Sequence, residues 1–147
     1  MATRTPGTTR RTPVQTVALV FGVVFLLVGV LGFIPGITQG AEEIAFAGPG
    51  SMAMLLGVFH VSVLHNIVHL LLGVAGIALS RRIDSAFMYL VGGGAIYLVL
   101  WLYGLVVGDN SAANFVPVNT ADDWLHLFLG LGMIALGLLT TRRAVRA

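Results

Sequence analysis

The short polar stretch Ser80-Arg81-Arg82-Ile83-Asp84-Ser85 separates two long apolar runs and decides how the chain folds. The other arginines lie only in the two terminal segments, at Arg4, Arg10, Arg11, Arg142, Arg143 and Arg146. Five of the six acidic residues lie in the two remaining gaps between apolar runs, at Glu42, Glu43, Asp109, Asp122 and Asp123. Arginine-rich segments stay on the cytoplasmic side of a membrane. The alternation therefore predicts an integral membrane protein with four helices and both termini in the cytoplasm.

The composition is that of a membrane protein. Of the 147 residues, 57% are hydrophobic and 10% are charged, and the mean hydropathy is +0.96, outside the range of water-soluble domains of this length. The formal net charge of +2 comes from arginines that suit anionic lipid headgroups, so the expected partner is the lipid bilayer and not nucleic acid. The chain has no cysteine, which excludes disulfides, thiolate metal sites and cysteine nucleophiles.

The expected fold is all-α, a bundle of four transmembrane helices in one domain. Its membrane part covers residues 14–141, between a cytoplasmic N-terminal tail of residues 1–13 and a cytoplasmic C-terminal tail of residues 142–147. A helix of about 20 apolar residues crosses a hydrocarbon core of about 30 Å. The apolar runs predict spans at about residues 14–33, 63–79, 86–107 and 124–139.

Two parts of this scheme have alternatives. The first run also resembles a secretory signal peptide, with Ala45-Phe46-Ala47 as a cleavage site, but its length favours an uncleaved anchor. Residues 52–61 are expected in or near the outer membrane interface, with Ser62 capping the second span, although they can also belong to that span.

The start of the fourth span has a signal of its own. Thr120-Ala121-Asp122-Asp123 has the spacing of a capping box, with Asp where Glu or Gln is usual, and Trp124 follows as an interfacial anchor. We therefore expect the helix to begin here, with Thr120 as the cap.

Two blocks of the chain match each other. The blocks Asn66–Gly73 and Asp123–Gly130 both have histidine at their fourth position and glycine at their last. Each block opens an even-numbered helix directly after an outer loop. The match predicts two tandem helix-pair repeats in the same orientation, related by a pseudo-twofold axis along the membrane normal.

Small residues recur seven positions apart in three of the predicted helices: Gly22 and Gly29, Gly73 and Ser80, Gly130 and Gly137. Small residues at such spacing line helix contacts in lipid, so these positions are expected where helices pack closely. The run Gly92-Gly93-Gly94 predicts a bend or a close crossing in the third helix.

Polar side chains at membrane depth mark the candidate site. His65 and His69 are four residues apart, so they share one helix face at a distance of about 6 Å. Polar groups in lipid normally face the bundle interior, as functional groups or as contacts between helices. The predicted cluster consists of His65, Asn66, His69, Tyr97, Asp122, Asp123 and His126.

The leading interpretation of this cluster is structural. In it, neutral His69 and His126 donate hydrogen bonds to carbonyls or to Asn66 and fix the helix register, and no cofactor is expected. The motif His-Asn-Ile-Val-His lacks the glutamate of a zinc protease, and no nucleophile motif surrounds a serine, so no enzyme is expected.

Three functional interpretations stay open beside it. A metal site is one, because His-x-x-x-His on one helix and ligands from another can complete a tetrahedral set. Its candidate ligands are His65, His69, His126 and Asp122. A haem held by His69 and His126 is the second. A proton or small-solute path through the bundle is the third.

The blocks Gly57–Leu70 and Asn114–Leu127 carry a resemblance. There, and across about residues 14–139, the chain resembles a family of small bacterial four-helix membrane proteins catalogued as a domain of unknown function, DUF4383. The resemblance implies the same four-span topology and the bacterial cytoplasmic membrane, and it implies no activity. A homo-oligomer and a membrane-protein partner stay open, as does a redox-associated accessory role, since the architecture is similar to that of the DoxX-like group.

Overall fold

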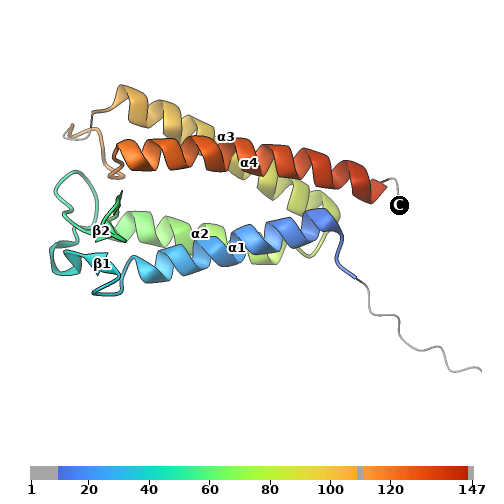
Figure 1. The fold of residues 1–147 in the computed structure, drawn as a ribbon, viewed down its shortest axis with the longest axis horizontal. Helices are drawn as coiled ribbons and strands as arrows, with labels where there is room; N and C mark the ends of the chain where they lie inside the picture. Colours follow the sequence, from blue (N-terminus) through green and yellow to red (C-terminus); the bar gives the residue numbers. More distant parts are fainter. Residues whose placement is uncertain (1–9, 109–110, 146–147) are drawn as a thin grey trace, which may run out of the picture.

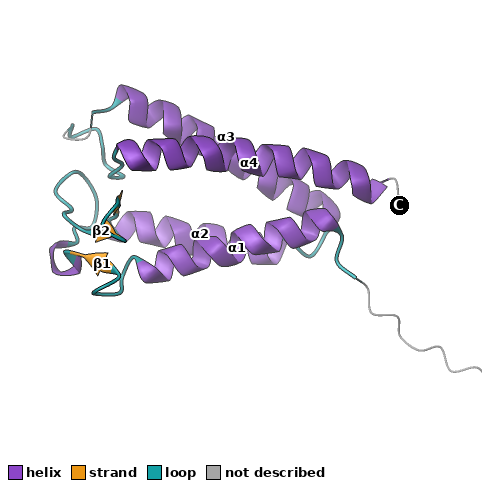
Figure 2. Ribbon diagram, in the orientation of Figure 1, coloured by secondary structure: helices purple, strands orange, loops and turns teal. Residues whose placement is uncertain are grey.

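The computed structural model describes residues 10–108 and 111–145, in which four α-helices run along the long axis with a small sheet at one end (Figure 1; Figure 2). The helices are α1 (Pro13–Leu31), α2 (Val63–Leu79), α3 (Ile83–Val106) and α4 (Thr120–Val145). Between α1 and α2 lie β1 (Thr38–Gln39), the short helix η1 (Ala41–Glu43), β2 (Met54–Leu55) and β3 (Phe59–His60). Arg4, Asp109 and Arg146 of the predicted charge pattern lie outside the described residues.

Three helices are long and apolar enough to cross a membrane: α1, α3 and residues Thr120–Arg142 of α4. The fourth helix, α2, is apolar but has 17 residues, at the lower end of what a span requires. Large apolar side chains are exposed along the outside of the helices, among them Leu27, Leu71, Val99 and Phe128. Apolar surface this extensive marks a membrane contact and not a face toward water.

The helix bounds follow the predicted spans, and they differ by more than one residue at the end of α1, at the start of α3 and at both ends of α4, which begins at Thr120. The helix α2 has the predicted bounds, Val63 and Leu79. The helix α1 ends at Leu31, two residues before the predicted end, and α3 begins at Ile83, three residues before the predicted start. The helix α4 continues to Val145, into the predicted tail. The apolar run that set the predicted end stops near Leu139, but Thr140-Thr141-Arg142-Arg143 contains no helix breaker, so the helix goes on.

The predicted cap of α2 is confirmed, and that of α4 was wrong by one residue. The Ser62 hydroxyl accepts a hydrogen bond from the His65 N–H at 3.1 Å. At α4 the reciprocal pair is Asn119 and Asp122: Asn119 Oδ1 accepts from the Asp122 N–H, and Asp122 Oδ2 accepts from the Asn119 N–H, both at 3.0 Å. Asn caps at least as well as Thr, and in this register Asp122 Oδ2 also accepts from the His60 N–H at 3.1 Å.

Residues 52–61, expected at the membrane interface, form a β-hairpin. Together with β1 it makes a three-stranded antiparallel sheet in the order β1-β2-β3, in which Leu55 pairs with Thr38 and with Phe59. Buried Ala53, Leu55 and Val61 pack against side chains at the end of α1. The all-α prediction missed this sheet because strands of two residues are too short to show an alternating pattern.

The helices are packed in two pairs, α1 with α2 and α3 with α4 (Figure 1). Glycine lets the backbones touch in each pair. A Cβ atom added at Gly22 would lie 2.7 Å from the Ile77 nitrogen, and one added at Gly94 would lie 2.7 Å from the Gly130 oxygen. The predicted packing role of Gly22 and Gly130 is thus confirmed, whereas Gly92 faces open space.

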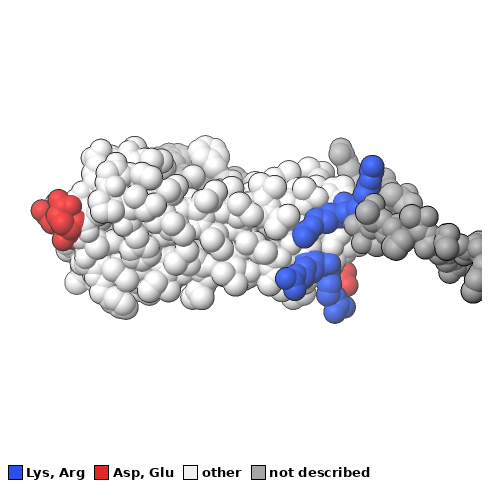
Figure 3. All heavy atoms as spheres, turned by 90° about the horizontal axis from the view of Figure 1, so that it is seen from below, with Lys and Arg blue, Asp and Glu red and all other residues white. Residues whose placement is uncertain are grey.

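Charged side chains gather at the two ends of the molecule. In Figure 3 the arginines lie at one end together with one acidic side chain, and the other acidic side chains in view lie at the opposite end, where η1 carries the exposed residues Glu42 and Glu43. At the arginine end, Arg11 Nη1 donates to Ser80 Oγ at 3.0 Å and Gln15 Nε2 donates to the Arg81 carbonyl at 2.8 Å. These bonds join the start of α1 to the turn between α2 and α3.

Candidate functional site

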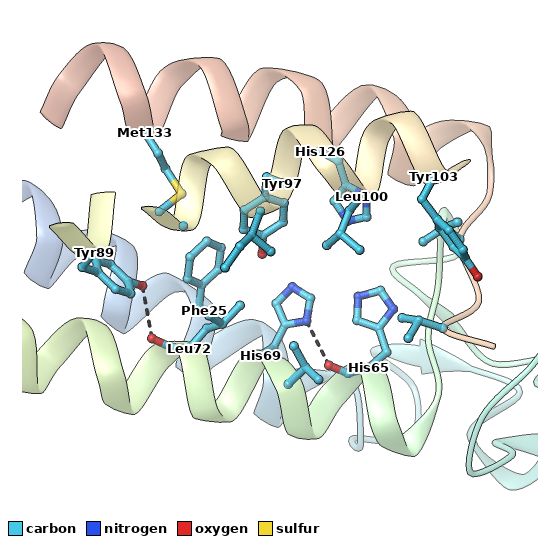
Figure 4. A pocket seen from close by; sticks show the side chains of 15 residues that line it. Phe25, His65, His69, Leu72, Tyr89, Tyr97, Leu100, Tyr103, His126 and Met133 are labelled. Carbon is cyan, nitrogen blue, oxygen red and sulfur yellow. Dashed lines mark hydrogen bonds between the residues drawn. The ribbon is translucent and has the colours of Figure 1, made fainter. Parts of the chain in front are cut away.

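A cavity of about 220 Å³ lies between the two helix pairs (Figure 4). Its wall is apolar and aromatic, except for three histidines and the hydroxyl groups of three tyrosines. The histidines are His65 and His69 on α2 and His126 on α4. Side chains that the sequence analysis placed in one polar cluster therefore meet around one enclosed space.

The two histidines of α2 lie on one face, as their spacing predicts. Their rings are stacked, with centroids 4.7 Å apart and planes at 19°. His69 Nδ1 is 3.1 Å from the His65 carbonyl oxygen, a hydrogen bond within the helix. Because both residues are buried, with exposed fractions of 6% and 9%, their rings meet the cavity and not solvent.

Aromatic rings connect the histidines of the two pairs. Phe25 of α1 lies 5.8 Å from the His69 ring and stacks on Tyr97 of α3 at 5.5 Å. Tyr97 lies 5.3 Å from the ring of His126. In Figure 4 these side chains point toward one another from facing helices. Aromatic side chains therefore form the contacts of the site between the two helix pairs.

The histidines do not hydrogen-bond across helices in the way the structural interpretation expects. His65 Nδ1, His126 Nδ1 and Asn66 Nδ2 are buried and have no hydrogen-bond partner among the described residues. The bond of His69 goes to a carbonyl, as expected, but that carbonyl belongs to its own helix. Buried polar atoms are nearly always paired, so unpaired nitrogens beside a cavity require an explanation.

The other members of the predicted cluster lie beside the cavity or away from it. Asp122 lines a smaller cavity of about 110 Å³ that it shares with the three histidines, and its Oδ2 accepts the N–H groups of Asn119 and His60. Asn66 packs against Gly32 at the contact of α1 with α2. Asp123 packs against Gly104 at the contact of α3 with α4. Asn66 and Asp123 therefore belong to helix contacts and line neither cavity.

The candidate metal ligands are close together without forming a ligand set. Within residues 10–108 and 111–145, no group of three or more His, Asp or Glu side chains is arranged to hold a metal ion. His65, His69 and His126 share the cavity, but the Asp122 oxygen that would complete four ligands is used by backbone N–H groups.

Sequence reasoning missed much of the wall. Phe25, Tyr89, Tyr103 and Met133 line the cavity, yet apolar residues at helical spacing are indistinguishable from core residues before the helices are placed. One signal was present: Phe25 follows Gly22 by three residues, as Tyr97 follows Gly94.

Comparison with known proteins identifies the family to which the chain is similar. Residues 15–139 match the model of a protein family described as a domain of unknown function (DUF4383). No curated protein and no solved structure matches the chain. The matched region contains every residue that lines the cavity.

Proposed function

Because this chain belongs to the DUF4383 family, whose function is unknown, we propose a function from the site: a multi-pass membrane protein without enzymatic activity that binds a small lipid-soluble molecule between its helix pairs. The observation that carries the proposal is an apolar cavity lined by His65, His69 and His126, two of which, His65 and His126, have an Nδ1 atom without a hydrogen-bond partner among the described residues. An unsatisfied buried polar group costs roughly 1–3 kcal/mol. A ligand that pairs these atoms recovers part of that cost.

The wall of the cavity supports a binding role over a catalytic one. No carboxylate, serine, threonine, lysine or arginine is among the described residues that line the main cavity. A histidine base needs a nucleophile or an acid partner within hydrogen-bond reach to act in acyl or phosphoryl transfer. Among the described residues no hydrogen bond joins a histidine of the cavity to one of its three tyrosines, and the Tyr89 and Tyr103 hydroxyls donate to backbone carbonyls. Small-molecule sites are mostly apolar with a few placed polar groups, which is the character of this wall. The protein then serves as an accessory membrane component.

The proposed topology has four spans, with both termini in the cytoplasm of a bacterium and the sheet outside its inner membrane. The separation of the exposed residues Glu42 and Glu43 from the arginines along the long axis supports it, since the positive-inside rule assigns the arginine end to the cytoplasm. At about 1.5 Å per residue α2 is about 25 Å long, so the residues beyond its ends complete the fourth crossing.

The chain contains no cysteine, so single cysteines test this topology directly. Glu43→Cys is expected to react with a membrane-impermeant maleimide in intact cells, and Arg81→Cys only after the membrane is opened. The reverse labelling pattern would overturn the topology.

The two helix pairs are proposed to be tandem repeats. The support is positional, because buried residues recur at the same spacing in both halves. In the odd-numbered helices they are Val14, Ala18, Gly22 and Phe25, and Ala86, Leu90, Gly94 and Tyr97. In the even-numbered helices they are His65, Asn66, His69, Gly73 and Gly76, and Asp122, Asp123, His126, Gly130 and Met133. The stacked rings of Phe25 and Tyr97 lie where a pseudo-twofold axis would pass.

A pair of neighbouring glycines provides the test of binding. Gly93 lines the cavity, and a side chain there would first meet the flexible end of Met133. Gly92 faces open space. In lipid nanodiscs the wild type and Gly92→Leu are expected to bind propylbenzene above the background of empty nanodiscs, and Gly93→Leu is expected to lose this binding. Equal binding by both variants would place the ligand elsewhere and overturn the proposal.

The metal and haem alternatives have their own experiment. The protein is purified without a metal-binding tag, and its absorption spectrum and metal content are measured beside those of a His69→Ala, His126→Ala double variant. A stoichiometric metal or a haem band that disappears in the variant would replace the proposed function with cofactor binding. No stoichiometric metal or haem in the wild type is the result that we expect.

A further inference from the structure

We propose that the ligand of the main cavity is a phenol, a lipid-soluble molecule with one aromatic ring that carries a hydroxyl group, and that it enters from the bilayer between α2 and α3. This inference rests on the proposed function and adds the chemical class of the ligand and its route.

The route follows from residues that line the cavity and are also exposed. Val68 of α2 and Ile96 of α3 both border the cavity, and their exposed fractions are 38% and 54%. The helices α2 and α3 belong to different pairs and touch each other far less than α1 touches α2. The cavity therefore opens sideways between them, onto an apolar face. For a helix pair that crosses a membrane, such an opening leads into the lipid.

The size of the cavity limits the ligand to about one ring. A dry apolar protein cavity of about 150 Å³ is known to bind benzene. The present cavity of about 220 Å³ has room for one ring with a short substituent. The stacked rings of Phe25 and Tyr97 lie in its wall and offer an aromatic ligand the contacts that aromatic rings prefer.

The hydrogen bond of His69 decides what its ring offers the ligand. A carbonyl oxygen accepts and cannot donate, so His69 Nδ1, at 3.1 Å from the His65 carbonyl, carries the proton. A neutral imidazole has one N–H and one lone pair. The lone pair of His69 is consequently on Nε2, and the ring presents a hydrogen-bond acceptor to the cavity.

The ring of His65 lies beside this acceptor. It stacks on the His69 ring with centroids 4.7 Å apart, and both residues line the cavity. The Nδ1 atom of His65 has no hydrogen-bond partner among the described residues. The acceptor that the geometry assigns to the cavity is therefore Nε2 of His69, with the His65 ring packed against it.

An acceptor in an apolar wall selects a neutral donor. A hydroxyl group donates to an imidazole lone pair, whereas an ether or a hydrocarbon leaves that lone pair unpaired. An ammonium group would donate as well, but no carboxylate among the described residues lines the main cavity to balance its charge. A metal ion would need further ligands, and the described part of the chain provides no such set. A phenol donates its one O–H to the His69 acceptor and fills the aromatic wall.

The test compares three ligands of nearly equal shape in lipid nanodiscs that contain the full chain: para-propylphenol, para-propylanisole and propylbenzene. Binding is measured as partitioning above that of empty nanodiscs of the same lipid. The phenol is expected to bind at least about tenfold more tightly than the methyl ether or the hydrocarbon, which corresponds to about 1.4 kcal/mol. The hydrocarbon is expected to bind measurably, since it matches the wall.

A double variant tests whether the stacked histidines provide the hydrogen-bond acceptor of the cavity. In a His65→Ala, His69→Ala double variant the preference for the phenol is expected to fall to within about twofold, while propylbenzene still binds, which also shows that the variant is folded. The matched control is His60→Ala, because His60 lies in β3 and lines neither cavity. This control is expected to keep the full preference.

The outcomes separate the two proposals. Equal binding of the three ligands by the wild type would overturn the phenol assignment and leave the proposed function intact. A full phenol preference in the double variant would overturn the role of His65 and His69. No binding of any of the three ligands would overturn the proposed function together with this inference.

Discussion

The α1–α2 pair and the α3–α4 pair bury residues at the same spacing, but they end differently near the loops. In the first pair, Asn66 packs against Gly32, and a three-stranded sheet covers the end. In the second pair, Asp123 packs against Gly104 at the corresponding positions, and no strand lies in the described part of the loop between α3 and α4. The comparison shows that close backbone contact restricts both pairs alike, whereas the residues beyond that contact differ between the pairs.

The residues that differ between the pairs determine what each pair contributes to the cavity. His69 and His126 occupy corresponding positions, one in each pair. His65 has Asp122 as its counterpart, and Phe25 has Tyr97. The first pair thus contributes two stacked imidazoles, and the second contributes one imidazole and the hydroxyl groups of three tyrosines. A cavity between two similar halves can therefore hold an asymmetric ligand in one orientation.

The largest expected effect on stability comes from substitutions that break the close helix contact found in both pairs. Gly22→Ala and Gly94→Ala each direct a Cβ at the backbone of the partner helix, which cannot move as a side chain does, so each is expected to lower the free energy of unfolding by about 3 kcal/mol. Thermal unfolding in detergent measures this loss.

Gly92→Ala is the matched control, because its Cβ meets open space and alanine favours the helix by up to about 1 kcal/mol. If only one of the two glycine variants were destabilised, the contacts of the two pairs would not be equivalent.

A smaller effect tests the helix starts, where the pairs differ. Ser62→Ala removes one bond, to the His65 N–H, and should cost about 1 kcal/mol. Asn119→Ala should cost about 2 kcal/mol, because the Asn119 side chain also donates to the Val58 carbonyl at 2.9 Å. Unfolding midpoints of both variants against the wild type provide the measurement. Equal losses would mean that the bond from α4 to the sheet loop adds no stability.

The smallest expected effect on stability compares two tyrosines of α3, Tyr89 and Tyr97. Tyr89 donates from its hydroxyl to the Leu72 carbonyl at 3.1 Å, a bond between the two helix pairs, so Tyr89→Phe should cost about 1 kcal/mol. Tyr97 makes no hydrogen bond within the described structure, so Tyr97→Phe should change stability by less than about 0.5 kcal/mol. Unfolding experiments that found the larger loss for Tyr97 would show a partner for its hydroxyl.

Much of the fold was predictable because lipid imposes simple requirements. The apolar runs predicted four helices, and the bounds of α2 agree with the prediction. The hairpin at Met54–His60 was not predictable, because its strands are too short to show a pattern and depend on the packing of Leu55 against the end of α1. The cap of α4 was misplaced because Asn119 and Thr120 are both good caps, and only the contact of Asp122 with β3 distinguishes them.

The histidines and Tyr97 of the candidate site were predictable from the sequence, but most of the cavity wall was not. Four-residue spacing was enough to place His65 and His69 on one face. Whether those rings meet another helix or an empty space depends on how the two helix pairs pack against each other. The spacing of residues within one helix carries no information about that packing.

The sequence by itself determined the helices, their apolar surfaces and the separation of charge, because each follows from local composition and from the cost of placing polar groups in lipid. Only the tertiary structure decided that Asn66 and Asp123 pack against glycines, that Asp122 binds the backbone of β3, and that three histidines surround a cavity. The reason is physical: a cavity exists where side chains from separate helices fail to fill the space between them, and that depends on the geometry of helix packing.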